Sequence, residues 1–351
     1  MHHTQFHIGA RSSRRSGLVA VKEIVIMAGL LAGLLWLLTH FVTTVGDQPS
    51  AAKSASEFAT VRGVTRISLA CDGKRLWIYR PLDGLVQIDL ATDEVLASVP
   101  LFGERLSAVA HSRDGTSSML CSYDGNILLI RHNGEPPLTT RLTRSGEAVV
   151  DARMTPDGSM AVCVTNRGRI HGWSEQDGRF AEFQYDLPPG GKAVKLGLGE
   201  TGQRMSIGRI DGTVSILDPV SGVPTGPELS LGASNLYAWS DDERLVAAAN
   251  ESGGIRVCDV RTGALVANVP WGSSSSWNFP AALALSPDGR RLAATTVATT
   301  EIRVWDIETG ALLSELRGHK GIVHALLFAS ADRLYSGSYD GEIRKWSLPQ
   351  L

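Results

Sequence analysis

The sequence predicts an all-β fold, a seven-bladed β-propeller, preceded by a single transmembrane helix. Two observations carry this prediction: a β-strand pattern that recurs at a nearly constant interval, and one long uncharged apolar segment near the N-terminus. Composition agrees, because 37 glycines in 351 residues indicate many turns. A net charge of −2 excludes a strongly basic nucleic-acid-binding protein, so we expect no nucleic-acid partner.

The apolar segment runs from Ile24 to Val45 and contains no charged residue. As an α-helix it would extend roughly 33 Å at about 1.5 Å per residue, enough for a hydrocarbon core of about 30 Å. A buried core helix is the alternative, but helices of soluble proteins carry a polar face. We therefore expect residues 24–45 to span a lipid bilayer as a signal-anchor.

The charges beside this segment predict its orientation. Arg11, Arg14, Arg15 and Lys22 precede it, whereas the first charge after it is Asp47. The positive-inside rule therefore places residues 1–23, a basic tail, in the cytoplasm, and everything after the helix on the extracytoplasmic side. Cleavage among the small residues at 50–56 stays an alternative, although the segment is longer than a secretory h-region of about 7–15 residues.

Two smaller features belong to the same region. Gly29 and Gly33 have the spacing that lets two membrane helices pack closely, which leaves a weak homodimer open. Residues 46–56 are small and polar and read as a flexible linker. The propeller is then expected over residues 57–351.

The repeat is a β run that ends in an acidic or polar residue and is followed by a turn. It occurs seven times, at intervals of roughly 41–47 residues, and intervals of this length are typical of propeller blades. The seven runs end at Asp89, Arg131, Ser174, Asp218, Asp259, Asp306 and Ser347. Each unit has room for four short strands, and such a sheet buries both faces only by stacking against neighbours.

The N-terminal end of the propeller is expected to complete its last blade. Residues 57–63 resemble the outer-strand sequence before Gly318, so we expect them to supply the fourth strand of the last blade and to remove its free edge.

The C-terminal repeats carry the sharpest motifs. They read SPDGRRLAATT from Ser286, EIRVWDIETGALLSELRGH from Glu301 and LYSGSYDGEIRKW from Leu334. This part of the chain resembles the WD40-repeat family, and upstream the pattern is degenerate. The resemblance implies that His319, Ser336, Asp340 and Trp346 occupy the family's His, Ser/Thr, Asp and Trp positions in a buried hydrogen-bonded network. His, Ser and Asp are also the residue types of a hydrolase triad. The sequence has no nucleophile elbow, so we expect a structural role for these residues.

The resemblance also implies that two sets of connections share one face: those from the second to the third strand, and those from each outer strand to the next inner strand. Candidate partner-binding residues follow from that face. In the longest departure from the repeat, between Pro270 and Pro280, we expect Trp271, Trp277 and Phe279 to contact a partner, the alternative being that both Trp pack on the blade edge. In the turns we select Arg80, Tyr123, Arg167, Arg209 and Tyr339. Three Arg would suit an acidic partner, and ordinary solvated charge is the alternative.

These observations predict a membrane-anchored, non-catalytic scaffold that binds other proteins or peptides and needs no cofactor. The alternative is an extracytoplasmic propeller enzyme of the quinoprotein or lactonase type. Such an enzyme needs acidic and His side chains around a metal or cofactor in the central channel. Three or more of them converging there would favour the enzyme.

Overall fold

The computed structural model describes residues 66–70, 75–80, 84–90, 92, 94–99, 106–112, 115–132, 138–176, 179–250, 254–270 and 280–349. The chain divides into two compact units, Met1–Ser54 and Ala55–Leu351, and every described residue belongs to the second. The predicted membrane helix at 24–45, with Gly29 and Gly33, lies outside the described residues. So do the linker and the strand expected at 57–63. Among the residues that are described, no helix is long and apolar enough to cross a membrane.

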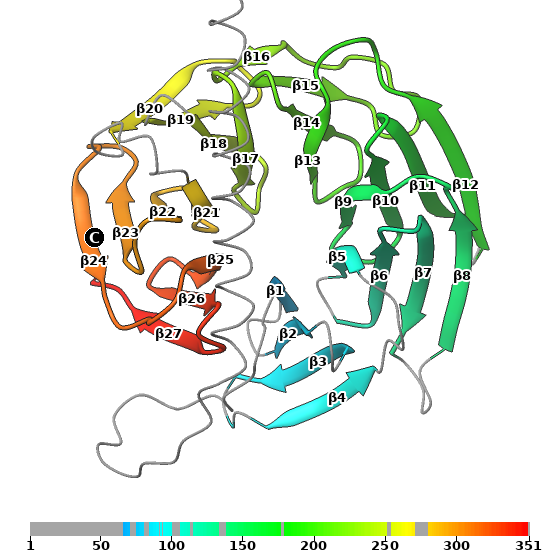
Figure 1. The fold of residues 1–351 in the computed structure, drawn as a ribbon. Coiled ribbons are helices and arrows are strands. Elements are labelled where there is room, and N and C mark those ends of the chain that lie inside the picture. The colour runs from blue at the N-terminus through cyan, green and yellow to red at the C-terminus, as the bar shows by residue number, and fades with distance from the viewer. Residues whose placement is uncertain are drawn as a thin grey trace, which may run out of the picture. The chain divides into compact units, whose positions relative to one another are not determined.

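The described residues form seven antiparallel sheets, six of four strands and one of three. In each sheet the strands follow chain order from the centre of the ring outward (Figure 1). This confirms the predicted all-β, seven-bladed propeller. We number the blades in chain order, from blade one (β1–β4) to blade seven (β25–β27).

The strand bounds are as follows. The innermost strands are β1 (Arg66–Ala70), β5 (Leu106–His111), β9 (Val149–Met154), β13 (Ala193–Leu198), β17 (Ser234–Trp239), β21 (Pro280–Leu285) and β25 (Val323–Ser330). The second strands are β2 (Arg75–Arg80), β6 (Ser117–Ser122), β10 (Met160–Thr165), β14 (Met205–Arg209), β18 (Leu245–Asn250), β22 (Arg291–Thr296) and β26 (Arg333–Ser338). The third strands are β3 (Gly84–Asp89), β7 (Asn126–Arg131), β11 (Arg169–Gln176), β15 (Thr213–Leu217), β19 (Gly254–Asp259), β23 (Ile302–Asp306) and β27 (Ile343–Ser347). The outer strands are β4 (Val95–Val99), β8 (Leu138–Arg144), β12 (Arg179–Asp186), β16 (Leu229–Ser230), β20 (Leu265–Pro270) and β24 (Leu312–Leu316).

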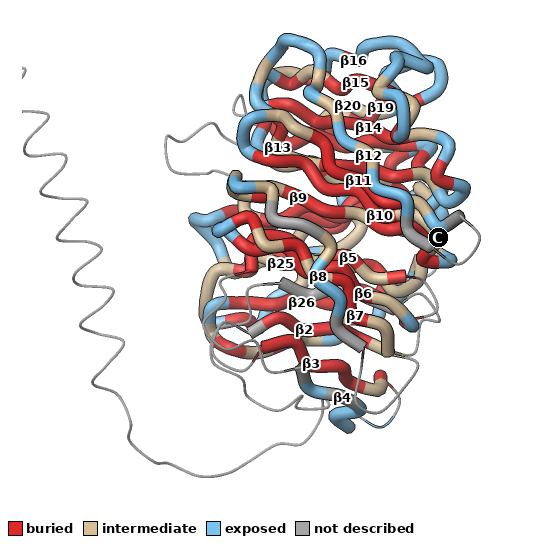
Figure 2. The backbone as a smooth tube through the Cα atoms, turned by 90° about the vertical axis from the view of Figure 1, so that its right-hand side faces the viewer, coloured by how far each residue is buried: buried red, intermediate tan, exposed pale blue. Residues whose placement is uncertain are grey.

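The hydrophobic core is divided among the seams between neighbouring blades. Each of its seven clusters joins two adjacent sheets, and buried residues concentrate in the strands while the turns are exposed (Figure 2). The seam that closes the ring joins Leu76 and Ile78 of blade one to Tyr335 and Ile343 of blade seven. A four-stranded sheet with two apolar faces is thus buried on both sides, which is why the repeat must recur.

The turn between the first and second strands has one geometry in five blades. The N–H of its fourth residue donates to the carbonyl of its first residue at 2.8–3.1 Å, and that fourth residue has a positive φ. Glycine holds this position in four blades, as Gly115, Gly158, Gly202 and Gly289, because it has no Cβ to clash. In blade five the position is held by Glu243, at φ 50°.

Candidate functional site

One face of the ring is built from the turns between second and third strands together with the loops that lead into the inner strands. Backbone hydrogen bonds tie the two sets together: Leu187 N–H donates to Gly168 O at 2.8 Å and Leu231 N–H donates to Gly212 O at 2.9 Å. In blade seven the turn is the donor instead, from Tyr339 N–H to the loop carbonyl of Ile322 at 3.0 Å. We call this surface the Asp-Gly face, after the Asp-Gly pairs in its turns.

The Asp-Gly face exposes large apolar side chains at one repeated position, the first residue of the turn. These are Tyr123 (54% exposed), Ile210 (49%), Val297 (41%) and Tyr339 (54%), from blades two, four, six and seven. Isolated exposed apolar residues are ordinary, but four at the same turn position present a spaced set on one surface. Sequence reasoning found the two tyrosines and missed Ile210 and Val297, although all four share the same place in the repeat.

The Tyr339 side chain packs against a histidine. Its ring stacks on His324, with centroids 4.4 Å apart and planes 16° apart. His324 is the second residue of β25 and also lines the central channel. An aromatic ring that is stacked in this way loses little freedom on binding, which suits a contact residue.

Blade seven contains the hydrogen-bonded chain that the WD40 resemblance implies. Trp346 Nε1–H donates to Ser336 Oγ at 2.8 Å, and Ser336 Oγ lies 2.7 Å from His319 Nε2. His319 Nδ1 lies 2.9 Å from Asp340 Oδ2, which also accepts the Lys320 N–H at 2.7 Å. The carboxylate can only accept, so Nδ1 carries the imidazole proton and Ser336 donates to Nε2.

Burial controls the protonation of this network. Burial lowers the pKa of His319 despite the Asp340 carboxylate beside it, so the imidazole stays neutral near pH 7. Burial acts to raise the pKa of Asp340, but the Glu342 and Lys320 N–H groups and His319 outweigh it, and the pKa is lowered. Ser336 is 0% exposed. A hydroxyl that is fully enclosed and already bonded on both sides is not placed to attack a substrate.

The three arginines selected from the sequence differ in how far their side chains are exposed. Arg167 is exposed, with 79% of its side chain accessible and Glu147 4.0 Å away. The expectation that Arg209 lies open on this face was wrong, because the residue is only 4% exposed. Arg80 ends β2, and its side chain lies outside the described residues, as do Trp271, Trp277 and Phe279.

Arg209 instead holds a loop in place. Its guanidinium donates to Pro188 O at 3.2 Å and to Gly191 O at 3.1 Å, while Asp211 Oδ2 accepts the Gly191 N–H at 3.1 Å. As the last residue of β14, Arg209 points into the loop that leads to β13 rather than out to solvent. A buried guanidinium is stable only when its donors are used in this way, so this charge supports the fold of the face.

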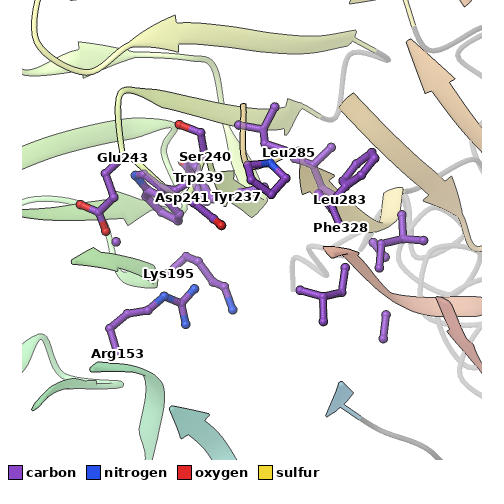
Figure 3. A pocket seen from close by; sticks show the side chains of 18 of the residues that line it. Arg153, Lys195, Tyr237, Trp239, Ser240, Asp241, Glu243, Leu283, Leu285 and Phe328 are labelled. Atoms are coloured by element: carbon purple, nitrogen blue, oxygen red, sulfur yellow. The ribbon is translucent and has the colours of Figure 1, made fainter. Parts of the chain in front are cut away.

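The central channel forms a cavity of about 980 Å³ lined by residues of β5, β9, β13, β17, β21 and β25. Figure 3 shows Arg153, Lys195 and Glu243 on one side of it and Leu283, Leu285 and Phe328 on the other. In the described part of the chain, the three metal-ligating side chains that come within ligand distance of one another are His319, Asp340 and Glu342. They lie in the blade-seven network rather than in the channel, and Glu342 is engaged by Arg344 at 2.6 Å. Among the described residues, no three acidic or His side chains therefore converge in the channel as the alternative of a propeller enzyme requires.

Comparisons with known proteins agree with this architecture. Residues 310–347 match the family model described as WD domain, G-beta repeat, which confirms the resemblance where the motifs are sharpest. The chain is thus a seven-bladed β-propeller with a WD40 repeat in its C-terminal part. The crystal structure of the Cps50 (Swd1) β-propeller domain from Myceliophteria thermophila superposes with a TM-score of 0.69 at 17% sequence identity. That similarity covers 86% of this chain and 100% of that one, and at this identity it shows the fold alone. No curated protein matches the chain.

Proposed function

We propose that this chain is a membrane-anchored, non-catalytic scaffold whose propeller binds other proteins through its Asp-Gly face. The observation that carries the proposal is the set of four exposed apolar residues, Tyr123, Ile210, Val297 and Tyr339, at one turn position. WD40 propellers generally bind other proteins, which supports the same reading. Aromatic residues are enriched among the side chains that carry most of the energy in protein interfaces.

The face has the rigidity that a docking surface needs. The turns are fixed to the neighbouring loops by backbone hydrogen bonds, and Arg209 with Asp211 holds the 188–191 loop beside them. A surface that is already ordered pays less conformational entropy when a partner binds. Partners are therefore expected to meet a preformed surface rather than a loop that folds on contact.

The experiment is comparative capture of partners from membranes by the full-length chain, with quantification of each captured protein. We compare the wild type with a variant carrying Ile210→Ala and Tyr339→Ala. A matched control carries Leu265→Ala and Val266→Ala, which removes exposed apolar side chains (57% and 43% exposed) from outer strand β20. Partners lost from the first variant and retained by the control support the proposal. An unchanged set of captured proteins contradicts it.

Anchoring is tested separately. The proposed insertion of residues 24–45, with the propeller on the extracytoplasmic side, is supported by the uncharged run and by the basic residues before it. The wild type should stay in the membrane pellet after alkaline extraction, and a Leu35→Arg, Leu38→Arg variant should be released because charges at mid-segment oppose insertion. In intact cells, an externally added protease should reach the propeller of an inserted protein. Protection of the propeller there would reverse the proposed orientation.

A further inference from the structure

Two histidines of blade two share one serine hydroxyl. His111 Nδ1 lies 2.7 Å from Ser118 Oγ, and the same oxygen lies 2.7 Å from His132 Nε2. Ser118, the second residue of β6, is 0% exposed, so solvent does not reach its hydroxyl. His111 ends β5 and lines the central channel, whereas His132 follows β7 and is partly buried. We call His111, Ser118 and His132 the histidine–serine chain.

The histidine–serine chain contacts blade one through Trp77 of β2. The Trp77 ring stacks on His111, with centroids 5.0 Å apart and planes 6° apart, and contacts the tilted ring of His132 at 4.8 Å. Trp77 is 1% exposed, and its Nε1–H makes no hydrogen bond to any described group. The indole is therefore held by packing and by the two imidazoles, so a change in their charge acts directly on the seam between the two blades.

A single hydroxyl limits the number of protons that this chain can hold. Ser118 Oγ has one hydrogen, so it donates to one imidazole and accepts an N–H from the other. When His132 gains a proton, both of its nitrogens are donors. Ser118 then accepts from His132 Nε2 and donates to His111 Nδ1, and His111 carries its own hydrogen on Nε2. When both imidazoles are cations, neither can accept the Ser118 hydrogen, and two like charges face one buried oxygen. The intact chain therefore accommodates one additional proton and excludes a second.

Burial decides which histidine takes the first proton. Burial, together with the charge of His132, lowers the pKa of His111 to about 3. Burial, together with the charge of Arg75 on β2, also lowers the pKa of His132, but this residue is the more accessible of the two. The other described charged side chains on the strands beside the chain are Asp89 on β3, Arg131 on β7, and Asp151 and Arg153 on β9.

We propose that the histidine–serine chain is a pH-sensitive fastening between blades one and two. It stays closed with one extra proton on His132, where the cation lies beside the Trp77 ring. It opens when a second proton enters at His111, because the hydroxyl can no longer bond both imidazoles. Opening separates Trp77 from the two rings and loosens the seam on the side of the channel.

Acid drives this opening because the open form binds more protons than the closed form. In the open form both imidazoles titrate near their ordinary pKa of about 6.5, whereas in the closed form His111 stays neutral. The closed form is therefore most favoured above about pH 6.5 and becomes less favoured as the pH falls below that value. For the proton at His111 alone, each pH unit below about 6.5 should raise the open population roughly tenfold.

The experiment is hydrogen exchange of the full-length chain between about pH 5.5 and about pH 4.5. Peptides from β2 and β5 are followed by mass spectrometry, with correction for the intrinsic pH dependence of exchange. In the wild type the corrected exchange should rise at least roughly tenfold per pH unit. His111→Asn places an uncharged amide near the position of Nδ1, so the rise should be roughly tenfold smaller per pH unit.

His171→Asn is the matched control. His171 is also a buried histidine, 4% exposed, but it lies in blade three and its ring makes no hydrogen bond to any described group. In this variant the exchange of the β2 peptide should keep the pH dependence of the wild type. A pH dependence that His111→Asn leaves unchanged overturns the proposal, and so does an equal reduction in both variants.

The order of protonation provides a second readout. In nitrogen NMR of the histidine-labelled full-length chain, with His132→Gln to assign the signals, His132 should become an imidazolium before His111. His111 should then carry its hydrogen on Nε2. Protonation of His111 first, or a hydrogen on its Nδ1 while His132 is charged, overturns the proposal. Ser118 lies at the opposite end of β6 from Tyr123, so none of these results bears on capture of proteins at the Asp-Gly face.

Discussion

Glu243 occupies the turn position that Gly289 occupies one blade later. Each N–H donates to the carbonyl three residues earlier, Glu243 to Ser240 at 2.8 Å and Gly289 to Ser286 at 2.9 Å. Their φ angles are 50° and 68°. The two turns therefore have the same backbone structure. Glycine favours this conformation at position 289, whereas glutamate at position 243 does not.

Replacing Glu243 by glycine should stabilise the propeller. The Glu243→Gly variant relieves the positive φ and removes a buried carboxyl group, so the free energy of unfolding should rise by about 1 kcal/mol or more. Urea denaturation of the full-length chain measures it. Glu243→Ala is the matched control, because it removes the carboxyl group but keeps a Cβ at the same φ. If both variants gain equally, the backbone is not strained at this position.

Removing the Ser336 hydroxyl should destabilise blade seven. Ser336→Ala leaves the Trp346 N–H and the His319 Nε2 without their shared partner in a buried site. An unsatisfied buried group costs about 1–3 kcal/mol, and the loss should appear in the free energy of unfolding. Ser347→Ala, at an exposed position of β27, should change it by less than about 0.5 kcal/mol. Equal effects of the two substitutions would show that the network adds no stability.

Stability should fall as the pH is lowered through about 6.5. Burial, reinforced by the neighbouring His132, lowers the pKa of His111 to about 3, and burial also lowers the pKa of His132. The unfolded chain then binds protons below about pH 6.5 that the folded chain does not. Stability is therefore lost as the pH falls, by up to about 1.4 kcal/mol per pH unit for His111. His111→Gln should show a shallower fall between about pH 6.5 and about pH 4, and an unchanged slope would contradict the assignment.

The close packing of turn and loop on the Asp-Gly face can be tested at Gly212. A Cβ there would lie 2.1 Å from the Gly232 backbone, and φ is +87°. Gly212→Ala should therefore cost more stability than Gly310→Ala, where φ is +68° and nothing lies within 4 Å of a Cβ. The control measures the conformational cost alone, about 1 kcal/mol, and the excess measures the packing. Similar losses for both would mean that the loop yields easily.

The repeat interval was sufficient to predict the number of blades because each blade depends on the same alternation of short strands and turns. Three-dimensional neighbours were not predictable in the same way. Arg209 follows the pattern of an exposed turn residue, but a single position along β14 decides whether the guanidinium meets solvent or the Pro188 carbonyl.

Other features depend on contacts between distant strands. The Trp77 ring stacks on His111, with centroids 5.0 Å apart, and contacts the tilted ring of His132 at 4.8 Å, and no local pattern indicates either contact. The unusual turn at Glu243 had one visible signal in the sequence, because Ser240-Asp241-Asp242-Glu243 stands where Ser286-Pro287-Asp288-Gly289 stands in the next repeat. A charged residue at a glycine position marked the place, but its burial and its positive φ became clear only in the structure.

His324 has a double position: one side of the residue lines the channel, and its ring supports Tyr339 on the outside. An occupant that tilts this imidazole would tilt the tyrosine as well, over a path of only two rings. By thermodynamic linkage, any such influence runs equally in both directions, so a protein bound at Tyr339 would change the affinity of the channel for an occupant by the same factor. The channel and the Asp-Gly face would then be coupled through the stacked rings of His324 and Tyr339.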